Sequence, residues 1–185
     1  MSELILVGGG ARSGKSAFAL ALARSLGPRR AFVATAEARD GEMRERIARH
    51  REERGAEFST VEEPLELARA VSALRGVDVA VIDCLTLWLS NLLLRGDPPA
   101  EIASRVERLL GALATAPFRS ILVTNEVGMG VVPESALGRA FRDVAGRAHQ
   151  VLAARADRLY LAALGTVLRI RPGPIVETRN PGDPA

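Results

Sequence analysis

The chain has 185 residues, of which 48% are hydrophobic and 25% charged, and its formal net charge is +3. This composition is typical of a soluble globular protein and excludes an intrinsically disordered chain, and the single cysteine, Cys84, excludes an internal disulfide. No window approaches the roughly 18 apolar residues that span a bilayer, and the amino terminus has no basic leader or cleavage site, so we expect a cytoplasmic protein without a membrane span.

The amino-terminal half alternates short apolar runs, each of the length of a buried strand, with stretches of helical pattern. The first apolar run leads directly into a glycine-rich segment, and Gly27 with Pro28 ends the helix that follows. We expect strands at residues 4–7, 31–35, 58–61 and 77–83, and helices at residues 16–25, 42–54, 64–74 and 85–94.

The carboxyl-terminal half continues the alternation. Asp97 followed by Pro98 is a helix start signal, an N-cap and a first-turn proline. Two runs flanking Gly165 predict a strand pair joined by a tight turn. The last 15 residues hold four prolines and little apolar content, so we expect a mobile tail at 171–185. The other expected elements are helices at residues 98–115 and 134–156 and strands at residues 120–124, 158–164 and 166–170.

Strands that alternate with helices and are continuously apolar indicate a parallel sheet covered on both faces. No internal repeat or linker divides the chain. We therefore predict a single α/β domain at residues 1–170, with a mostly parallel sheet flanked by helices and a C-terminal strand pair. Together with the glycine-rich motif described next, this architecture predicts a P-loop NTPase-type, RecA-like fold.

The turn after the first strand carries the full Walker A pattern, Gly-x-x-x-x-Gly-Lys-Ser. Glycines let backbone N–H groups approach phosphates, and the following helix directs its amino-terminal N–H groups at the same anion. Lys15, the only lysine in the chain, is expected to reach the β- and γ-phosphates, and Ser16 to ligate Mg²⁺. The predicted phosphate-binding residues are Gly9, Gly10, Ala11, Arg12, Ser13, Gly14, Lys15 and Ser16.

A P-loop requires a second carboxylate near its metal ion. Asp83 ends a strand in which five of the six preceding residues are apolar or small, and it is the first candidate, although aspartate is also a favoured helix cap. Glu126, after the strand at 120–124, is a weaker candidate because strand ends at this edge face the nucleotide. Signalling GTPases read guanine with an Asn-Lys-x-Asp segment, which a chain with one lysine cannot supply.

The two histidines, His50 and His149, have different surroundings. His149 lies beside the apolar side of a predicted helix and is interpreted as structural. His50 lies in a charged stretch that composition alone assigns to a solvated helix. Guanidinium groups would also keep its imidazole neutral and able to act as a nucleophile, so both alternatives stay open. The surrounding arginines are Arg44, Arg46, Arg49, Arg51 and Arg54.

Several segments together resemble one family, the bifunctional adenosylcobinamide kinase / adenosylcobinamide-phosphate guanylyltransferases of cobalamin synthesis, over roughly residues 3–170. Their combination and order are more specific than any one of them. The segments are Gly-Gly-Ala-Arg-Ser-Gly-Lys-Ser at 9–16, Val-Ala-Thr-Ala at 33–36, Asp-Gly-Glu-Met at 40–43 through Ile-Ala-Arg-His-Arg at 47–51, Asp-Cys-Leu-Thr-Leu-Trp-Leu-Ser-Asn-Leu-Leu at 83–93, Thr-Asn-Glu-Val-Gly at 124–128 and Gly-Arg-Ala-Phe-Arg-Asp at 138–143.

The resemblance implies two reactions. The γ-phosphate of ATP or GTP goes to adenosylcobinamide, and a GMP–histidine intermediate then delivers GMP from GTP to adenosylcobinamide phosphate. His50 falls on the position of the family's nucleophile. The P-loop motif and the strand end, rather than the resemblance, assign Lys15 to the phosphates and Ser16 and Asp83 to Mg²⁺. The resemblance also implies a homo-oligomer, with a trimer as the favoured form. The implied nucleotide contacts outside the P-loop are Ala34, Thr35, Ala36, Arg51, Glu52, Glu53, Arg54, Glu62 and Asp83.

Two other functions remain as alternatives at this point. One is a small-molecule P-loop kinase without a covalent intermediate. The other is a non-enzymatic, nucleotide-dependent binding protein that uses its positive charge for nucleic acid. Because aromatic residues make up only 4% and acidic residues are interspersed with the arginines, no nucleic-acid partner is expected.

Overall fold

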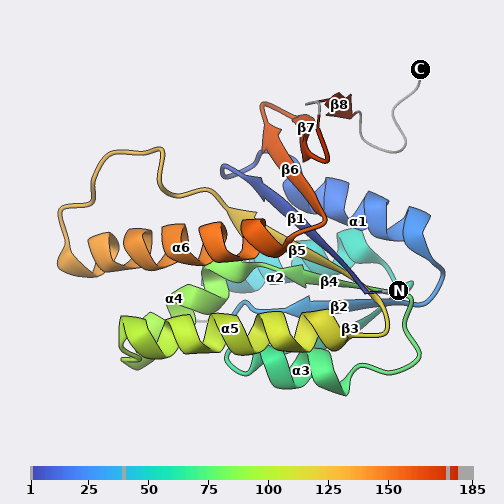
Figure 1. The fold of residues 1–185 in the computed structure, drawn as a ribbon, viewed down its shortest axis with the longest axis horizontal. Helices are drawn as coiled ribbons and strands as arrows, with labels where there is room; N and C mark the ends of the chain where they lie inside the picture. Colours follow the sequence, from blue (N-terminus) through green and yellow to red (C-terminus); the bar gives the residue numbers. More distant parts are fainter. Residues whose placement is uncertain (1, 39–40, 174–175, 179–185) are drawn as a thin grey trace.

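The computed structural model describes residues 2–38, 41–173 and 176–178. Within this part of the chain, eight strands form one sheet in the order β3-β2-β4-β5-β1-β6-β7-β8 (Figure 1). The first six strands in this order are parallel to one another, and β7 and β8 continue the sheet by antiparallel pairing. The strands are β1 (Glu3–Gly9), β2 (Arg30–Ala34), β3 (Phe58–Glu62), β4 (Val79–Asp83), β5 (Arg119–Asn125), β6 (Arg158–Ala163), β7 (Thr166–Arg171) and β8 (Val176–Thr178).

Helices cover both faces of the sheet, as predicted. The side chains of α1 pack with one face, and α3, α4, α5 and α6 pack with the other (Figure 1). Trp88 of α4 is fully buried and its indole N–H donates to Leu65 O, so it belongs to the core. The helices are α1 (Lys15–Leu26), α2 (Gly41–Arg54), α3 (Leu67–Ala73), α4 (Leu85–Arg95), α5 (Pro99–Thr115) and α6 (Ala136–Arg155).

The central strands are apolar because they are buried on both faces. Val79, Ala80, Val81 and Ile82 of β4 have no exposed surface, and side chains from both sides of the sheet surround them. This accounts for the continuous apolar run that the sequence shows, since a one-sided sheet would have given alternation. The mostly parallel sheet and its C-terminal strand pair are confirmed. Among the described helices, none combines the length and apolarity that a bilayer crossing requires.

The predicted N-cap role of Asp97 is wrong. Helix α5 begins at Pro99, with Pro98 at the N-cap position and no side-chain capping bond. The Asp97 carboxylate accepts from the Arg95 guanidinium and lies 3.2 Å from Nε of Arg105. The carboxylate of Asp97, which the sequence predicted to cap the helix, is therefore bound by two guanidinium groups instead.

A short strand at the carboxyl end was not predicted. Val176–Thr178 pairs antiparallel with β7 as β8, and Arg171 closes β7 rather than beginning the tail. Three residues flanked by prolines give no strand signal in the sequence. The mobility of the tail stays a prediction, because residues 174–175 and 179–185 lie outside the described part of the chain.

His149 joins α6 to the sheet, in line with its structural interpretation. Its Nε2 lies 2.7 Å from Oγ1 of Thr124 on β5. Burial lowers the pKa of His149 below its ordinary value of 6.5, and the charge of Glu126 opposes that shift only in part.

This buried imidazole makes stability depend on pH. A histidine pKa that is lower in the folded state means that the unfolded chain binds the proton more readily. The contribution of the buried, neutral His149 to the stability of the fold is therefore complete above the unfolded pKa and is lost as the pH falls below about 6.5. We expect the Tm of the protein to fall between pH 7.5 and 5.5, and to fall less in His149→Gln, as measured by thermal unfolding. An equal fall in both proteins would contradict this role.

Candidate active site

Two glycines shape the loop between β1 and α1. A Cβ on Gly9 would lie 2.4 Å from Ala162 O and 2.7 Å from Oγ of Ser13, so a side chain cannot be accommodated. Gly14, at the N-cap of α1, has a φ of 91°, in the left-handed region that favours glycine. Gly9 and Gly14, the two glycines of the Walker A pattern, are therefore required by the backbone itself.

Lys15 and Ser16 begin α1 at the centre of this loop. Lys15 is only 6% exposed, and its Nζ donates to Gly10 O at 3.0 Å, which folds the loop around the ammonium. Oγ of Ser13 is buried without a hydrogen-bond partner among the described residues. A buried donor in an anion-binding loop, beside the N–H groups of a helix start, suits a phosphate oxygen.

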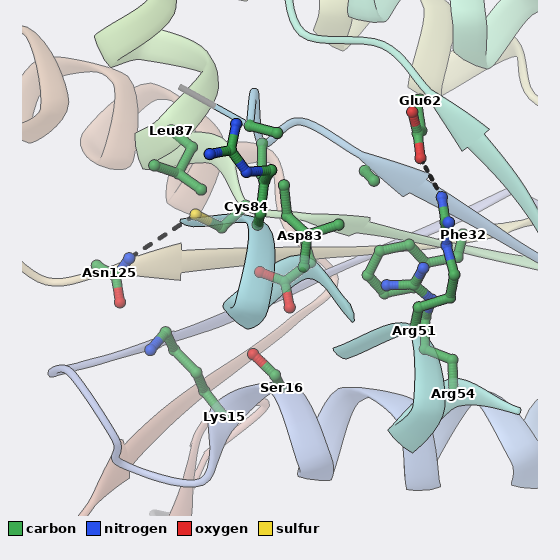
Figure 2. A pocket seen from close by; sticks show the side chains of 15 residues that line it. Lys15, Ser16, Phe32, Arg51, Arg54, Glu62, Asp83, Cys84, Leu87 and Asn125 are labelled. Carbon is green, nitrogen blue, oxygen red and sulfur yellow. Dashed lines mark hydrogen bonds and ion pairs between the residues drawn. The ribbon is translucent and has the colours of Figure 1, made fainter. Parts of the chain in front are cut away.

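Asp83 faces this loop from the end of β4. Figure 2 shows its carboxylate opposite Ser16, and both residues line one pocket with Lys15. The N-cap position of α4 is occupied by Cys84, so the alternative that Asp83 serves as a helix cap is wrong. The carboxylate that the sequence predicted for the metal is thus placed beside the serine predicted for the same role.

Arg54 forms another wall of the pocket. Its guanidinium lies 4.0 Å from the ring centroid of Phe32, and the residue is only 4% exposed. Burial, followed by the positive charge of Arg51, lowers the pKa of Arg54 below its ordinary value. Its Nε has no hydrogen-bond partner among the described residues. A desolvated guanidinium on an aromatic ring attracts an anion strongly, because little water screens it.

The rim of the pocket is polar. Arg51 of α2 and Glu62 of β3 form an ion pair there, with both side chains more than half exposed (Figure 2). Glu52 is exposed on α2 and does not line the pocket. The backbones of His50 and Glu53 lie in α2, but their side chains lie outside the part of the chain that the structure describes.

Thr35 has a different place from its two neighbours. Ala34 and Ala36 line the pocket, but Thr35 is fully buried behind it. Its hydroxyl donates to Cys84 O and accepts from Cys84 N, each at 2.8 Å, and its carbonyl accepts from Nδ2 of Asn91. These bonds tie the end of β2 to the β4–α4 junction, so Thr35 holds the pocket wall in place.

Asn125 is a pocket residue that was not predicted from the sequence. It ends β5 beside Gly9 of β1, and its Nδ2 donates to Oγ1 of Thr86 at 2.9 Å. The position of Asn125 at the end of a predicted strand could have indicated a site residue, but Glu126, the next residue, was chosen because it carries a carboxylate. Glu126 instead accepts from the N–H groups of Gly128 and Met129 and shapes the following loop. Other lining residues that were not predicted as site residues are Phe32, Ala38, Ile47, Cys84 and Leu87, and Arg44, one of the arginines around His50, also lines the pocket.

The loop after β1, the acidic end of β4 and the sheet order define a P-loop nucleotide-binding protein. The solved structure of the RadB recombinase has a TM-score of 0.55 to this chain at 19% identity, covering 96% of this chain and 87% of that one. This likeness establishes the RecA-like fold that the sequence predicted.

Sequence comparison defines the family within this class. Residues 5–170 match the family described as cobinamide kinase / cobinamide phosphate guanyltransferase, and the chain belongs to it. The bifunctional adenosylcobalamin biosynthesis protein CobP of Pseudomonas aeruginosa is 46% identical over 176 residues, covering 95% of this chain and all of the relative. The CobU proteins of Salmonella typhimurium and Escherichia coli are 40% and 39% identical, each covering 91% of this chain and 99% of the relative. The resemblance in the sequence is confirmed.

Proposed function

We propose that this chain phosphorylates adenosylcobinamide with ATP or GTP and then transfers GMP from GTP, through a GMP–histidine on His50, to give adenosylcobinamide-GDP. One observation carries the proposal: a single pocket joins Lys15, Ser16 and Asp83 of the phosphate site to Arg54 of α2, the helix that contains His50. The family and the names of the curated relatives support both activities.

The first step is a phosphoryl transfer at the P-loop. The hydroxyl oxygen of the corrinoid side chain bonds to the γ-phosphorus and loses its proton to solvent, and the bond from that phosphorus to the β–γ bridging oxygen breaks to release the nucleoside diphosphate. Lys15 and the loop N–H groups stabilise the charge that develops on the phosphate oxygens. Mg²⁺, held by Ser16 and Asp83 together with phosphate oxygens, would neutralise charge on the β- and γ-phosphates.

The second step is a nucleotidyl transfer. An imidazole nitrogen of His50 bonds to the α-phosphorus as pyrophosphate leaves, and the phosphate of the phosphorylated corrinoid then displaces the histidine. A covalent intermediate divides one difficult transfer into two displacements. The pocket-lining positions 47, 51 and 54 of α2 recur at helical spacing, and position 50 lies three residues after the first and four before the last. Arg54 would stabilise the phosphate charge at this place.

The assembly and location of the protein belong to the same proposal. We expect a homotrimer in the cytoplasm that uses GTP and ATP with Mg²⁺, and whose substrates are adenosylcobinamide and adenosylcobinamide phosphate. Ala34, Ala36, Arg51 and Glu62 are proposed nucleotide contacts because they line the pocket. Thr35, whose polar groups are used within the fold, is proposed to support them.

Radioactive GTP distinguishes this function from a kinase without an intermediate. We expect α-³²P-GTP to leave label on the denatured protein, labile in acid and stable in alkali as a phosphoramidate should be, and γ-³²P-GTP to leave none. Adding unlabelled adenosylcobinamide phosphate should release the label as adenosylcobinamide-GDP. Absence of α-label on the wild-type protein would overturn the covalent route.

A further inference from the structure

The turn between β6 and β7 has an unusual residue at its tip. Ala163 pairs with Thr166, so Leu164 and Gly165 form a two-residue hairpin loop, with φ angles of 53° and 80°. Two positive φ angles define a type I′ turn, which favours Asn, Asp or Gly at its first central position. A leucine is disfavoured there by contact of its Cβ with the backbone, and this leucine is also fully exposed (102%). Neither local conformation nor core packing therefore accounts for the side chain.

This turn lies against the phosphate-binding loop. Strand β6 pairs with β1 up to Gly9 and Ala162 (Figure 1), and Ala162 O limits the space at Gly9. At the other end of the loop, a Cβ on Gly14 would lie 3.9 Å from Cα of Gly165. Leu164 is thus an exposed apolar side chain directly beside a polyphosphate site.

The direction in which a triphosphate would lie connects the exposed Leu164 with the phosphate-binding loop. In the sheet, β4 and β5, which carry Asp83 and Asn125, lie on one side of β1, and the β6–β7 turn lies on the other. For phosphoryl transfer, the γ-phosphate must lie on the Asp83 side, where the metal residues are. A triphosphate that runs along the loop from there brings its nucleoside toward Leu164.

Nucleotidyl transfer requires a different placement. The α-phosphorus must then meet a nucleophile on α2, which lines the pocket on the Asp83 side through Ile47, Arg51 and Arg54. One nucleoside position cannot serve both reactions if the γ-phosphorus is attacked in the first and the α-phosphorus in the second on the same side of the loop.

We propose that the β6–β7 turn is the purine-binding subsite for the triphosphate donor of the phosphoryl-transfer step, with the Leu164 side chain packed on a face of the base. This inference rests on the proposed function and divides the nucleotide site into two modes, which share the P-loop and differ in where the nucleoside lies. An apolar contact on the ring face does not read the edge of the base, so this subsite accepts adenine and guanine alike.

The variant Leu164→Asn separates this role from a structural one. Asn-Gly is a favoured type I′ pair, so the variant should keep or raise the Tm of the protein. We expect the KM for ATP in the kinase reaction to rise about tenfold, with kcat little changed, because an apolar contact with the base is lost. Labelling of the protein by α-³²P-GTP should keep its dependence on GTP concentration.

Two controls make the test specific. Leu94→Asn changes another exposed leucine, 52% exposed at the end of α4, and should leave the KM for ATP unchanged. Inorganic tripolyphosphate, which has no base, should inhibit the wild-type protein and Leu164→Asn equally. If the substitution damaged the P-loop instead, tripolyphosphate would inhibit the variant less than the wild type. An unchanged KM for ATP, or an equal loss in kinase and labelling reactions, would overturn the subsite. Absence of label on the wild-type protein would instead overturn the proposed covalent route.

Discussion

Replacing His50 with alanine should abolish the covalent label from α-³²P-GTP and lower guanylyl transfer on the order of 10⁴-fold or more, because no nucleophile then meets the α-phosphorus. The P-loop, Asp83 and Arg54 are unchanged in this variant, so GTP binding and the kinase step should persist. Autoradiography of the denatured protein measures the label, and phosphorylation of adenosylcobinamide by γ-³²P-ATP measures the kinase step.

The composition of the chain gives this experiment a matched control. His149 is the only other histidine, and it lies in α6 with its Nε2 bonded to Thr124. His149→Gln should retain the label, although its stability will respond differently to pH. A phosphoramidate that survives in His50→Ala would have to lie on another nitrogen nucleophile, such as His149 or Lys15, and would contradict the assignment of the nucleophile.

Replacing Lys15 with alanine should weaken the binding of ATP and GTP by about 10- to 100-fold, since charge-assisted hydrogen bonds to the phosphates are lost. Both reactions should slow further than the loss of binding alone would cause, because the ammonium also stabilises charge that develops during transfer. Isothermal titration with each triphosphate, and the two activity assays, measure these effects.

The burial of the Lys15 side chain suggests a second variant at this position. The ammonium of Lys15 is nearly buried and donates to Gly10 O, so the wider guanidinium of Lys15→Arg should not restore binding although the charge is kept. Lys15→Ala with wild-type affinity for GTP would contradict the P-loop interpretation. A loss of nucleotide binding alone, with an unchanged Tm, would support it.

The parts of the site that the sequence predicted well depend on local chemistry. The Walker A pattern was readable because its glycines, lysine and serine follow one another in a single turn, and Asp83 is marked by the buried strand that it ends. The sheet was predictable because apolar runs of strand length, without alternation, are typical of strands buried on both faces. The family resemblance then added roles for residues, such as His50, that no local pattern distinguishes from a solvated helix.

The parts that were missed depend on contacts between distant segments. Nothing in the charged helix indicates that Arg54 is buried on Phe32, which lies 22 positions earlier on β2. Thr35 is buried because Cys84 and Asn91 supply its hydrogen-bond partners. Asp97 does not cap helix α5 because its carboxylate contacts Arg105 of that helix instead. Each outcome was decided by a tertiary neighbour, which sequence patterns do not reveal.

The position of β1 in the sheet also has a consequence for biosynthesis. Its two neighbours are β5 and β6, whose residues follow it by more than 110 positions, and Gly9 is enclosed by a carbonyl of β6. Within this domain β1 is synthesised before both of its partners, so its pairing has to wait for them. The Walker A segment that follows β1 therefore cannot take its folded form until β6, which encloses Gly9, has been synthesised.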